Sequence, residues 1–372
     1  MKIGIMTFWW SEDNYGQLLQ CYALQKYLRD QGHDPYLIRY DPRNDYIKSP
    51  FWLRLVRACN PVVLFNFLKQ KRRFYLASKE QIHNNRGFEL FRKTYIAQSE
   101  TLYTSYKQLQ EDPPQADMYI VGSDQVWNFY DMSLRKCNNV LHAYFLDFGP
   151  STVKRVSYAA SWSVSDLKNE IAEEIKPLLK RFSYVSVREK EAIELCRTLG
   201  VDAEWVCDPT LLLKPDVYRS VFKEENFTKK SKPYLFLYLL GNECDCSIED
   251  ILLWIQNKNL DIVYITGNAN IDNYDKIYAT IPEWLFLLDN AEYVITNSFH
   301  CCVFSSLFNK QFAAVPAKGA IEGMNTRLES LWELLKIEKR YLIDGDFLVL
   351  DRKYKTYINS TTKFLNKVFY GK

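Results

Sequence analysis

Histidine is scarce in this sequence, with four among 372 residues. Because histidine has the ordinary pKa closest to neutrality, few side chains here are suited to transferring a proton at neutral pH. The nine cysteines have no zinc-ribbon spacing, and Cys244 and Cys246 lack a second pair nearby. We therefore expect no metal site, and free thiols in a reducing cytoplasm.

Long apolar runs are also missing, since none approaches the roughly 20 residues of a membrane-spanning helix. Residues 1–10 contain one Lys and no small-residue cleavage site, so they are more typical of a strand than of a signal peptide. The sequence shows no internal repeat and no low-complexity segment. These features favour a cytoplasmic location.

Charge of one sign is not in large excess, because the net charge is +3. We therefore expect no general attraction to polyanions and no nucleic-acid partner. Residues 43–93 nevertheless carry twelve Lys or Arg against three acidic residues, a local +9 that leaves −6 elsewhere. Aromatic and aliphatic residues interleave with these charges. The segment predicts either peripheral contact with the membrane or a helical insertion packed on its own domain, and its many apolar residues favour the packed insertion.

The length suffices for two domains, and 47% hydrophobic with 25% charged residues is a globular composition. Short apolar strands, polar or glycine turns and amphipathic helices alternate in both halves, which predicts an α/β fold. We expect an amino-terminal domain over 1–214, including the insertion 43–93, and a carboxyl-terminal domain over 215–340. The tail, 341–372, is predicted to be helical near its end and to pack back on the first domain.

A strand–turn–helix unit is expected in the second domain around His300. Residues 293–296 form a β-branched and aromatic run typical of a buried parallel strand, and Asn297 and Ser298 are helix-capping residues. His300 then lies at the carboxyl end of its strand, the edge at which open α/β sheets bind ligands. Both a functional role and a simple capping role fit this position.

Polar residues also follow the strands expected in the first domain. Asp124 comes after the strand 118–121, where it suits either a turn-capping role or a catalytic carboxylate. Arg188 follows the strand 184–187 and suits either a surface role or an anion clamp. The turn 14–16 contains a glycine before a helix, which is a possible anion seat. The three-glycine dinucleotide fingerprint is absent, so an ordinary turn without a ligand fits this glycine as well.

Seven motifs together resemble the polysaccharide pyruvyl transferase family, and they occur in the family's order over about residues 1–335. Residues 43–93 are not covered by the resemblance. Two cysteines, Cys301 and Cys302, stand where family members usually carry small residues after the histidine. The motifs are Asn14-Tyr15-Gly16-Gln17-Leu18-Leu19-Gln20 with Tyr22-Ala23-Leu24, Gly122-Ser123-Asp124-Gln125-Val126-Trp127-Asn128, Tyr158-Ala159-Ala160-Ser161, Ser186-Val187-Arg188-Glu189, Asp208-Pro209-Thr210-Leu211, Thr296-Asn297-Ser298-Phe299-His300 and Asn325-Thr326-Arg327-Leu328.

The resemblance implies two Rossmann-like domains facing a cleft, as in the GT-B architecture. It also implies transfer of a pyruvyl group from phosphoenolpyruvate to a pair of sugar hydroxyls in a polysaccharide or its lipid-linked precursor. The product would be a pyruvate ketal, with phosphate released and no cofactor needed.

Candidate site residues combine the motifs with the strand-end positions. His300 could deliver a proton to the donor or hold its phosphate, and both roles stay open. Arg188 is a candidate anion clamp, and Asp124 a candidate to orient the acceptor or to act as its base. The expected substrate-binding residues are Asn14, Tyr15, Gly16, Gln17, Ser123, Gln125, Asn128, Ser161, Asn297, Ser298, Lys318, Asn325 and Arg327.

Two other functions remain open at this point. A GT-B glycosyltransferase that uses a nucleotide sugar would share the expected architecture. A non-catalytic carbohydrate-binding protein would share the fold but would not need His300, Arg188 and Asp124. The sequence identifies neither the acceptor sugar nor the oligomeric state.

Overall fold

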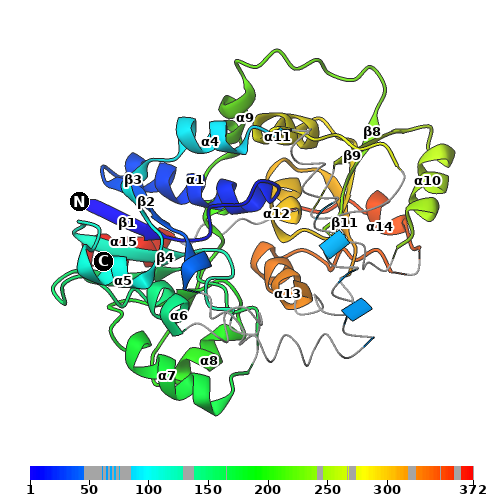
Figure 1. Ribbon diagram of the computed structural model, residues 1–372. Coiled ribbons are helices and arrows are strands. Elements are labelled where there is room, and N and C mark those ends of the chain that lie inside the picture. Colours follow the sequence, from blue (N-terminus) through cyan, green and yellow to red (C-terminus); the bar gives the residue numbers. More distant parts are fainter. Residues whose placement is uncertain are drawn as a thin grey trace.

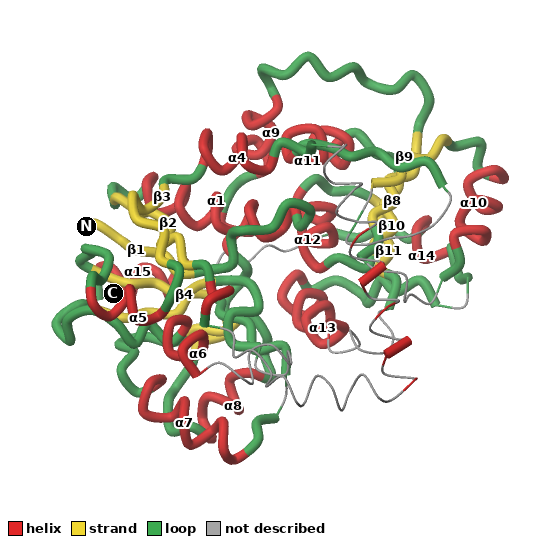
Figure 2. Tube along the Cα trace, viewed as in Figure 1, coloured by secondary structure: helices red, strands yellow, loops and turns green. Residues whose placement is uncertain are grey.

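The computed structural model describes residues 1–45, 85–128, 138–164, 166–240, 246–265, 274–316, 324–343, 345–355 and 362–371, with a few isolated positions between them. Two parallel sheets organise these residues, one from each half of the chain (Figures 1 and 2). The first sheet has the strand order β3-β2-β1-β4-β5 and the second has the order β11-β10-β8-β9.

The first half contains the strands β1 (Lys2–Met6), β2 (Asp34–Tyr40), β3 (Gln98–Tyr103), β4 (Met118–Gly122) and β5 (Lys154–Tyr158). A short parallel pair, β6 (Ser186–Val187) and β7 (Glu204–Trp205), continues beyond β5 through isolated bridges. The helices of this half are α1 (Tyr15–Asp30), α4 (Phe88–Tyr95), α5 (Tyr106–Glu111), α6 (Asn138–Tyr144), α7 (Asn169–Leu179) and α8 (Ala192–Thr198), with the 3-10 turns η1 (Pro42–Asn44) and η3 (Pro209–Leu212).

The second half contains the strands β8 (Tyr234–Tyr238), β9 (Asp261–Ile265), β10 (Tyr293–Thr296) and β11 (Gln311–Ala314). Thr280 and Glu283 form a reciprocal capping box at the start of α11, where a proline also favours the first turn. The helices are α9 (Pro215–Phe222), α10 (Ile248–Asn257), α11 (Ile281–Asp289), α12 (Phe299–Leu307), α13 (Met324–Leu335), α14 (Leu348–Asp351) and α15 (Thr362–Tyr370).

One hydrophobic cluster joins the two halves. Tyr15, at the start of α1, stacks on Trp284 of α11 with ring centroids 5.3 Å apart and planes inclined by 15°. Its hydroxyl donates a 2.7 Å hydrogen bond to the carbonyl of Ala279. The amino-terminal end of α1 is therefore held against the second half of the molecule, which matters for the site described below.

The tail contacts both halves in turn. In α14, Val349 and Leu350 pack in the cluster behind the second sheet. In α15, Phe364, Leu365 and Val368 pack against the strands of the first sheet, and Figure 1 shows this red helix beside β1 and β4. The boundaries at 214 and 340 remain predictions.

Two helices begin near the predicted boundary and after β5. α9 forms directly after residue 214, where Pro215 starts a helix whose Tyr218 and Val221 are buried. α7 begins at Asn169, and before it the carboxylate of Asp166 accepts from the backbone of its neighbour, Leu167.

Most of the insertion 43–93 lies outside the described residues, so its membrane role stays a prediction. The structure describes residues 85–93 at the end of the insertion, and these are part of the fold. Phe88 and Phe91 of α4 are buried in the cluster that joins the halves. At isolated positions within it, Phe65 and Leu68 are exposed. Within the described ranges, no helix has both the length and the apolar composition needed to cross a bilayer.

Candidate functional site

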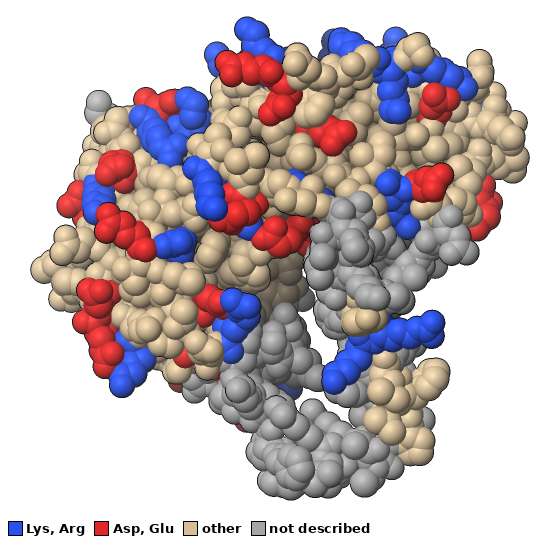
Figure 3. Space-filling model, turned by 45° about the horizontal axis from the view of Figure 1, so that its top comes forward, with Lys and Arg blue, Asp and Glu red and all other residues tan. Residues whose placement is uncertain are grey.

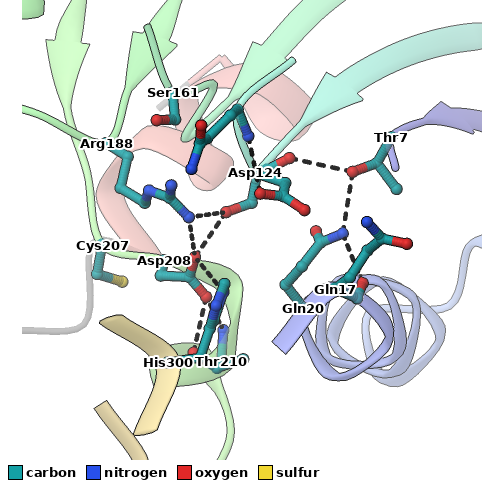
Figure 4. Close-up of polar contacts among 12 residues, drawn as sticks. Thr7, Gln17, Gln20, Asp124, Ser161, Arg188, Cys207, Asp208, Thr210 and His300 are labelled. Atoms are coloured by element: carbon teal, nitrogen blue, oxygen red, sulfur yellow. Dashed lines mark hydrogen bonds and ion pairs between the residues drawn. The ribbon is translucent and has the colours of Figure 1, made fainter. Parts of the chain in front are cut away.

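The carboxyl ends of strands from both halves meet at one buried polar cluster. Ser123 follows β4, Arg188 follows β6, Asp208 lies between β7 and η3, and His300 is the second residue of α12, after β10. Figure 4 shows the side chains of Arg188 and His300 pointing toward Asp208 from different elements. The convergence is expected, because the carboxyl edges of parallel sheets are open to turns and helix starts.

Asp208 is the centre of this cluster and is almost fully buried. Its Oδ2 atom accepts from the Ser123 hydroxyl at 2.6 Å and from Arg188 Nη1 at 3.1 Å, and lies 3.5 Å from His300 Nε2. Its Oδ1 atom accepts from the backbone N–H and the hydroxyl of Thr210, at 3.0 and 2.7 Å. Burial alone would raise the pKa of Asp208, but His300, Arg188 and the Ser123 hydroxyl hold it well below its ordinary value.

Arg188 is a buried guanidinium whose donors are only partly used. Its Nη1 atom bonds Asp208, and its plane lies 4.6 Å from the ring centroid of Phe299. Among the described residues, no hydrogen-bond acceptor is found for its Nε and Nη2 atoms, although Glu189 lies 3.6 Å from Nε. Burial lowers the pKa of Arg188, but the carboxylates of Glu189, Asp208 and Asp124 raise it by more. The pKa is therefore raised above its ordinary value, and the guanidinium stays charged.

Arg327 brings a second buried guanidinium to the same place. It lies in α13, which is held near Arg188 because the backbone N–H of Lys190 donates to the Ser330 hydroxyl at 3.2 Å. Burial and the neighbouring charge of Arg188 lower the pKa of Arg327 to about 10. Two mutually repelling cations buried together indicate a site for an anion with more than one negative group.

His300 is placed by a helix start and by a close approach of α1. Ser298 caps α12 by accepting from the backbone of Cys301, which sets His300 in the first turn. On its Nδ1 side, the imidazole lies against Gly16 of α1. A Cβ atom added to Gly16 would lie 2.2 Å from Nδ1. Only glycine at position 16 leaves room for the ring.

The motif at the start of α1 shapes this approach. Asn14 caps the helix by accepting from the backbone of Gln17, whose own side chain accepts from the backbone of Ser11 at 2.8 Å. One turn later, Gln20 donates to the Thr7 hydroxyl, which in turn donates to the Ser123 carbonyl (Figure 4). These bonds tie the helix start to the strand ends of the first sheet.

Asp124 lies beside the cluster in a left-handed backbone conformation, with φ of 71°. Its carboxylate accepts from the backbone of Gln125, which is the turn-capping role expected of it. Its charge also acts on Arg188 and Arg327. Both of the roles considered for Asp124 are therefore compatible with its position.

Several expected substrate-binding residues make contacts within the fold, and their role toward a substrate stays a prediction. Tyr15 is buried in the shared core, and Asn297 bonds both backbone groups of Leu240. Ser298 is a helix cap, and the amide of Asn128 donates to Gln125.

Three more expected residues are Ser161, Asn325 and Lys318. Ser161 donates to Glu189, next to Arg188. Asn325 is in the first turn of α13, two positions before Arg327. Lys318 lies outside the described residues.

Asp208, Thr210 and Glu189 were not expected as site residues. A signal for them existed, because Asp208-Pro209-Thr210 is a cap sequence directly after a strand and Glu189 follows Arg188. Within the described part of the chain, no group of three or more His, Cys, Asp or Glu side chains is placed to hold a metal ion.

The fold is of the GT-B type, with two Rossmann-like α/β halves. A UDP-GlcNAc 2-epimerase from Methanocaldococcus jannaschii superimposes with a TM-score of 0.50 at 14% identity, over 100% of both chains. A putative UDP-N-acetylglucosamine 2-epimerase from Listeria monocytogenes gives a TM-score of 0.48 at 8% identity, over 100% of this chain and 97% of that one. At 14% identity, the likeness to the Methanocaldococcus jannaschii structure shows the fold alone.

The chain belongs to the polysaccharide pyruvyl transferase family. The model of that family matches residues 14–318, which include every strand-end residue of the buried cluster. No curated protein matches the chain.

Proposed function

We propose that this protein transfers a pyruvyl group from phosphoenolpyruvate to two hydroxyls of a sugar, within a polysaccharide or its lipid-linked precursor. The observation that carries the proposal is the pair of buried guanidinium groups, Arg188 and Arg327, of which Arg188 shares the Oδ2 atom of Asp208 with His300. Phosphoenolpyruvate has a carboxylate and a phosphate on adjacent atoms. Guanidinium groups bind both by parallel hydrogen bonds, which supports this donor.

The chemistry needs a proton donor and a place for negative charge. Protonation of the vinyl carbon by His300 makes C2 electrophilic, and the first sugar hydroxyl adds there and loses its proton. The C2–O bond to phosphate then breaks, with the electron pair leaving on phosphate, and the second hydroxyl bonds to C2, closes the ketal and gives its proton to the phosphate. The donor and a diol thus give a ketal carrying a methyl group, and hydrogen phosphate. Asp124 lies where it could accept a hydroxyl proton, and the guanidinium groups would hold the departing phosphate.

A direct test separates this proposal from a glycosyltransferase that uses a nucleotide sugar. A ligand at 100 times its Kd stabilises the folded state by about 2.7 kcal/mol, so donor binding is visible in the melting temperature. We expect phosphoenolpyruvate to raise the melting temperature and UDP-sugars to leave it unchanged. The reverse result would favour the glycosyltransferase, and no shift with either would favour a carbohydrate-binding protein.

Turnover is then followed with candidate acceptors. We expect phosphate release to depend on the acceptor, and a new ketal methyl signal to appear in the proton NMR spectrum of the product. Phosphate release without a ketal methyl group would contradict the proposed transfer.

We also propose a cytoplasmic enzyme, peripheral at the inner face of the membrane if its acceptor is lipid-linked. On the face shown in Figure 3, the described basic and acidic side chains are interspersed. The local charge of +9 in segment 43–93 makes that segment our candidate for the contact. Its exposed residues Phe65 and Leu68 support the idea. Flotation with anionic vesicles tests it, since absence of binding at low salt would rule out the contact.

A further inference from the structure

Asp208 has no acceptor capacity left for a substrate. Its Oδ1 atom accepts two hydrogen bonds from Thr210, and its Oδ2 atom faces Ser123, Arg188 and His300. A carboxylate offers about four acceptor positions, and these contacts fill them. With 1% of its surface exposed, the group neither reaches a substrate nor receives a proton from one.

The orientation of Arg188 depends on this carboxylate. Asp208 bonds Nη1, which leaves the Nε and Nη2 atoms as the donors without an acceptor among the described residues. Nε and one Nη form the parallel edge of a guanidinium that binds a carboxylate or phosphate. The contact to Asp208 therefore selects which edge remains for an anion.

The orientation of His300 depends on it as well. The imidazole lies between Asp208, 3.5 Å from Nε2, and Gly16, which contacts the ring at Nδ1. Gly16 and Asp208 belong to the first half of the chain and His300 to the second. The carboxylate thus lies against the imidazole of His300 across the junction of the two halves.

We propose that Asp208 is a positioning residue, which sets the guanidinium of Arg188 and the imidazole of His300 in one mutual geometry for the donor anion. The inference rests on the proposed function of this site. The contrasting reading is a salt bridge that only neutralises buried charge and maintains the fold.

The sharpest variant is Asp208→Glu, because it keeps the charge but moves the carboxylate by one methylene. Displacements of about 1 Å in an active site lower turnover by as much as 100-fold, so we expect a fall in kcat of that order per folded molecule. Asp208→Asn should fall at least as far. Both Asp208 oxygens receive only donors, so the amide nitrogen would face a donor in either orientation. If Asp208→Glu keeps the wild-type kcat, the positioning role is wrong.

Asp45 provides a matched control. It is also a buried carboxylate, and its Oδ2 atom accepts from the hydroxyl of Tyr40 and the backbone of Tyr106, both at 2.6 Å, away from the cluster. Asp45→Glu is expected to lower the melting temperature while leaving kcat and KM for phosphoenolpyruvate unchanged per folded molecule. An Asp208→Glu variant that behaves in the same way would have a structural role only.

A binding measurement separates failure of this inference from failure of the proposed function. Calorimetry with inorganic phosphate needs no turnover, and the site charge is the same in wild type and Asp208→Glu. We expect the variant to bind phosphate about tenfold more weakly, since one charge-assisted hydrogen bond is worth roughly a factor of ten or more. Equal phosphate affinity in the two proteins overturns the inference. If Asp208→Glu binds phosphate more weakly but the wild type never consumes phosphoenolpyruvate, the positioning role stands and only the proposed reaction is refuted.

Should both Asp208 variants fail to fold, Thr210→Val replaces them. It removes the hydroxyl that donates to Oδ1 and keeps the side-chain volume and the charge of the site. The Asp208 carboxylate then loses one of the hydrogen bonds that set its orientation. A single lost hydrogen bond to a charged group corresponds to about a tenfold fall in kcat at an active site. Ser305→Ala, which removes an equally buried hydroxyl bonded to the Cys301 carbonyl, is the control expected to keep kcat. Wild-type kcat in Thr210→Val would then count against the proposal.

Discussion

At the scale of single residues, the site is defined by ionisable side chains that are buried together. Such groups lose their hydration on burial, so proteins retain them where they are paired or used. Here the basic and acidic groups are close to balance, and the Nε and Nη2 atoms of Arg188 make no hydrogen bond among the described residues, although Glu189 lies 3.6 Å from Nε. The buried groups are Asp124, Arg188, Glu189, Asp208, His300 and Arg327.

Arg188→Lys is predicted to abolish most of the activity although it keeps the positive charge. A lysine ammonium cannot offer the parallel Nε and Nη2 donors, and its shorter reach weakens the bond to Asp208. We expect kcat/KM for phosphoenolpyruvate to fall about 100-fold or more, or about 3 kcal/mol of transition-state stabilisation. Steady-state kinetics measures the change. Arg219→Lys, at a partly exposed ion pair with Asp289, is the control expected to retain activity.

The lowered pKa of Asp208 predicts a pH dependence of stability. The folded-state pKa lies below the ordinary 3.8. The carboxylate therefore contributes stability above pH 3.8, and this contribution is lost as the pH falls through the folded-state value. We expect the difference in melting temperature between wild type and Asp208→Asn to be largest near neutral pH and to shrink below about pH 4. If the difference in melting temperature stayed constant from neutral to acid pH, Asp208 would not be ionised in the folded protein.

At the scale of elements, the site is built from the first residues after strands and the first turn of helices. Sequence reasoning located these points well, because caps such as Ser298 and Asn14 mark helix starts. The strand β10 was predicted with its observed bounds. The edge strand β3 was not predicted, because its polar residues 98–101 are largely outside the apolar core and carry no alternating pattern. Its pairing with β2 comes from the tertiary fold.

Gly16→Ala is predicted to disable the site without unfolding the protein. In a helix, alanine is ordinarily favoured over glycine by about 1 kcal/mol. Here the new Cβ would overlap the ring of His300, so the imidazole must leave its position between Gly16 and Asp208. We expect a fall in kcat of about 100-fold, with the far-UV circular dichroism unchanged. An active Gly16→Ala enzyme would show that this placement of the ring is not needed.

At the scale of the whole molecule, contacts between the halves and the return of the chain end hold the fold together. The cluster around Tyr15 and Trp284 fixes α1 against the second half, and α15 returns the end of the chain to the first sheet. The Asp208–His300 pair lies between the halves. Any relative movement of the halves would therefore change the distance on which the site depends.

Phe364→Ala is predicted to destabilise the protein by about 3–5 kcal/mol, because a buried aromatic side chain is lost from the cluster with β1 and β4. α15 supplies none of the candidate site residues, so activity per folded molecule should be unchanged well below the melting temperature. Thermal unfolding measures the effect. Tyr370→Ala, at a half-exposed position of the same helix, is the control expected to change stability little. Equal stability of the two variants would mean that α15 is not docked.

The sequence alone was enough to indicate the α/β class, the family and the principal cationic and acid–base candidates, because strand periodicity, helix caps and motif order are local properties of the chain. The partners of these residues were decided only by the tertiary structure. Asp208 and His300 are 92 residues apart, and their pairing depends on how two sheets pack across a shared core. Burial then gives the cluster its chemistry, because removing water strengthens each charge interaction, and no local pattern records which side chains lose their water.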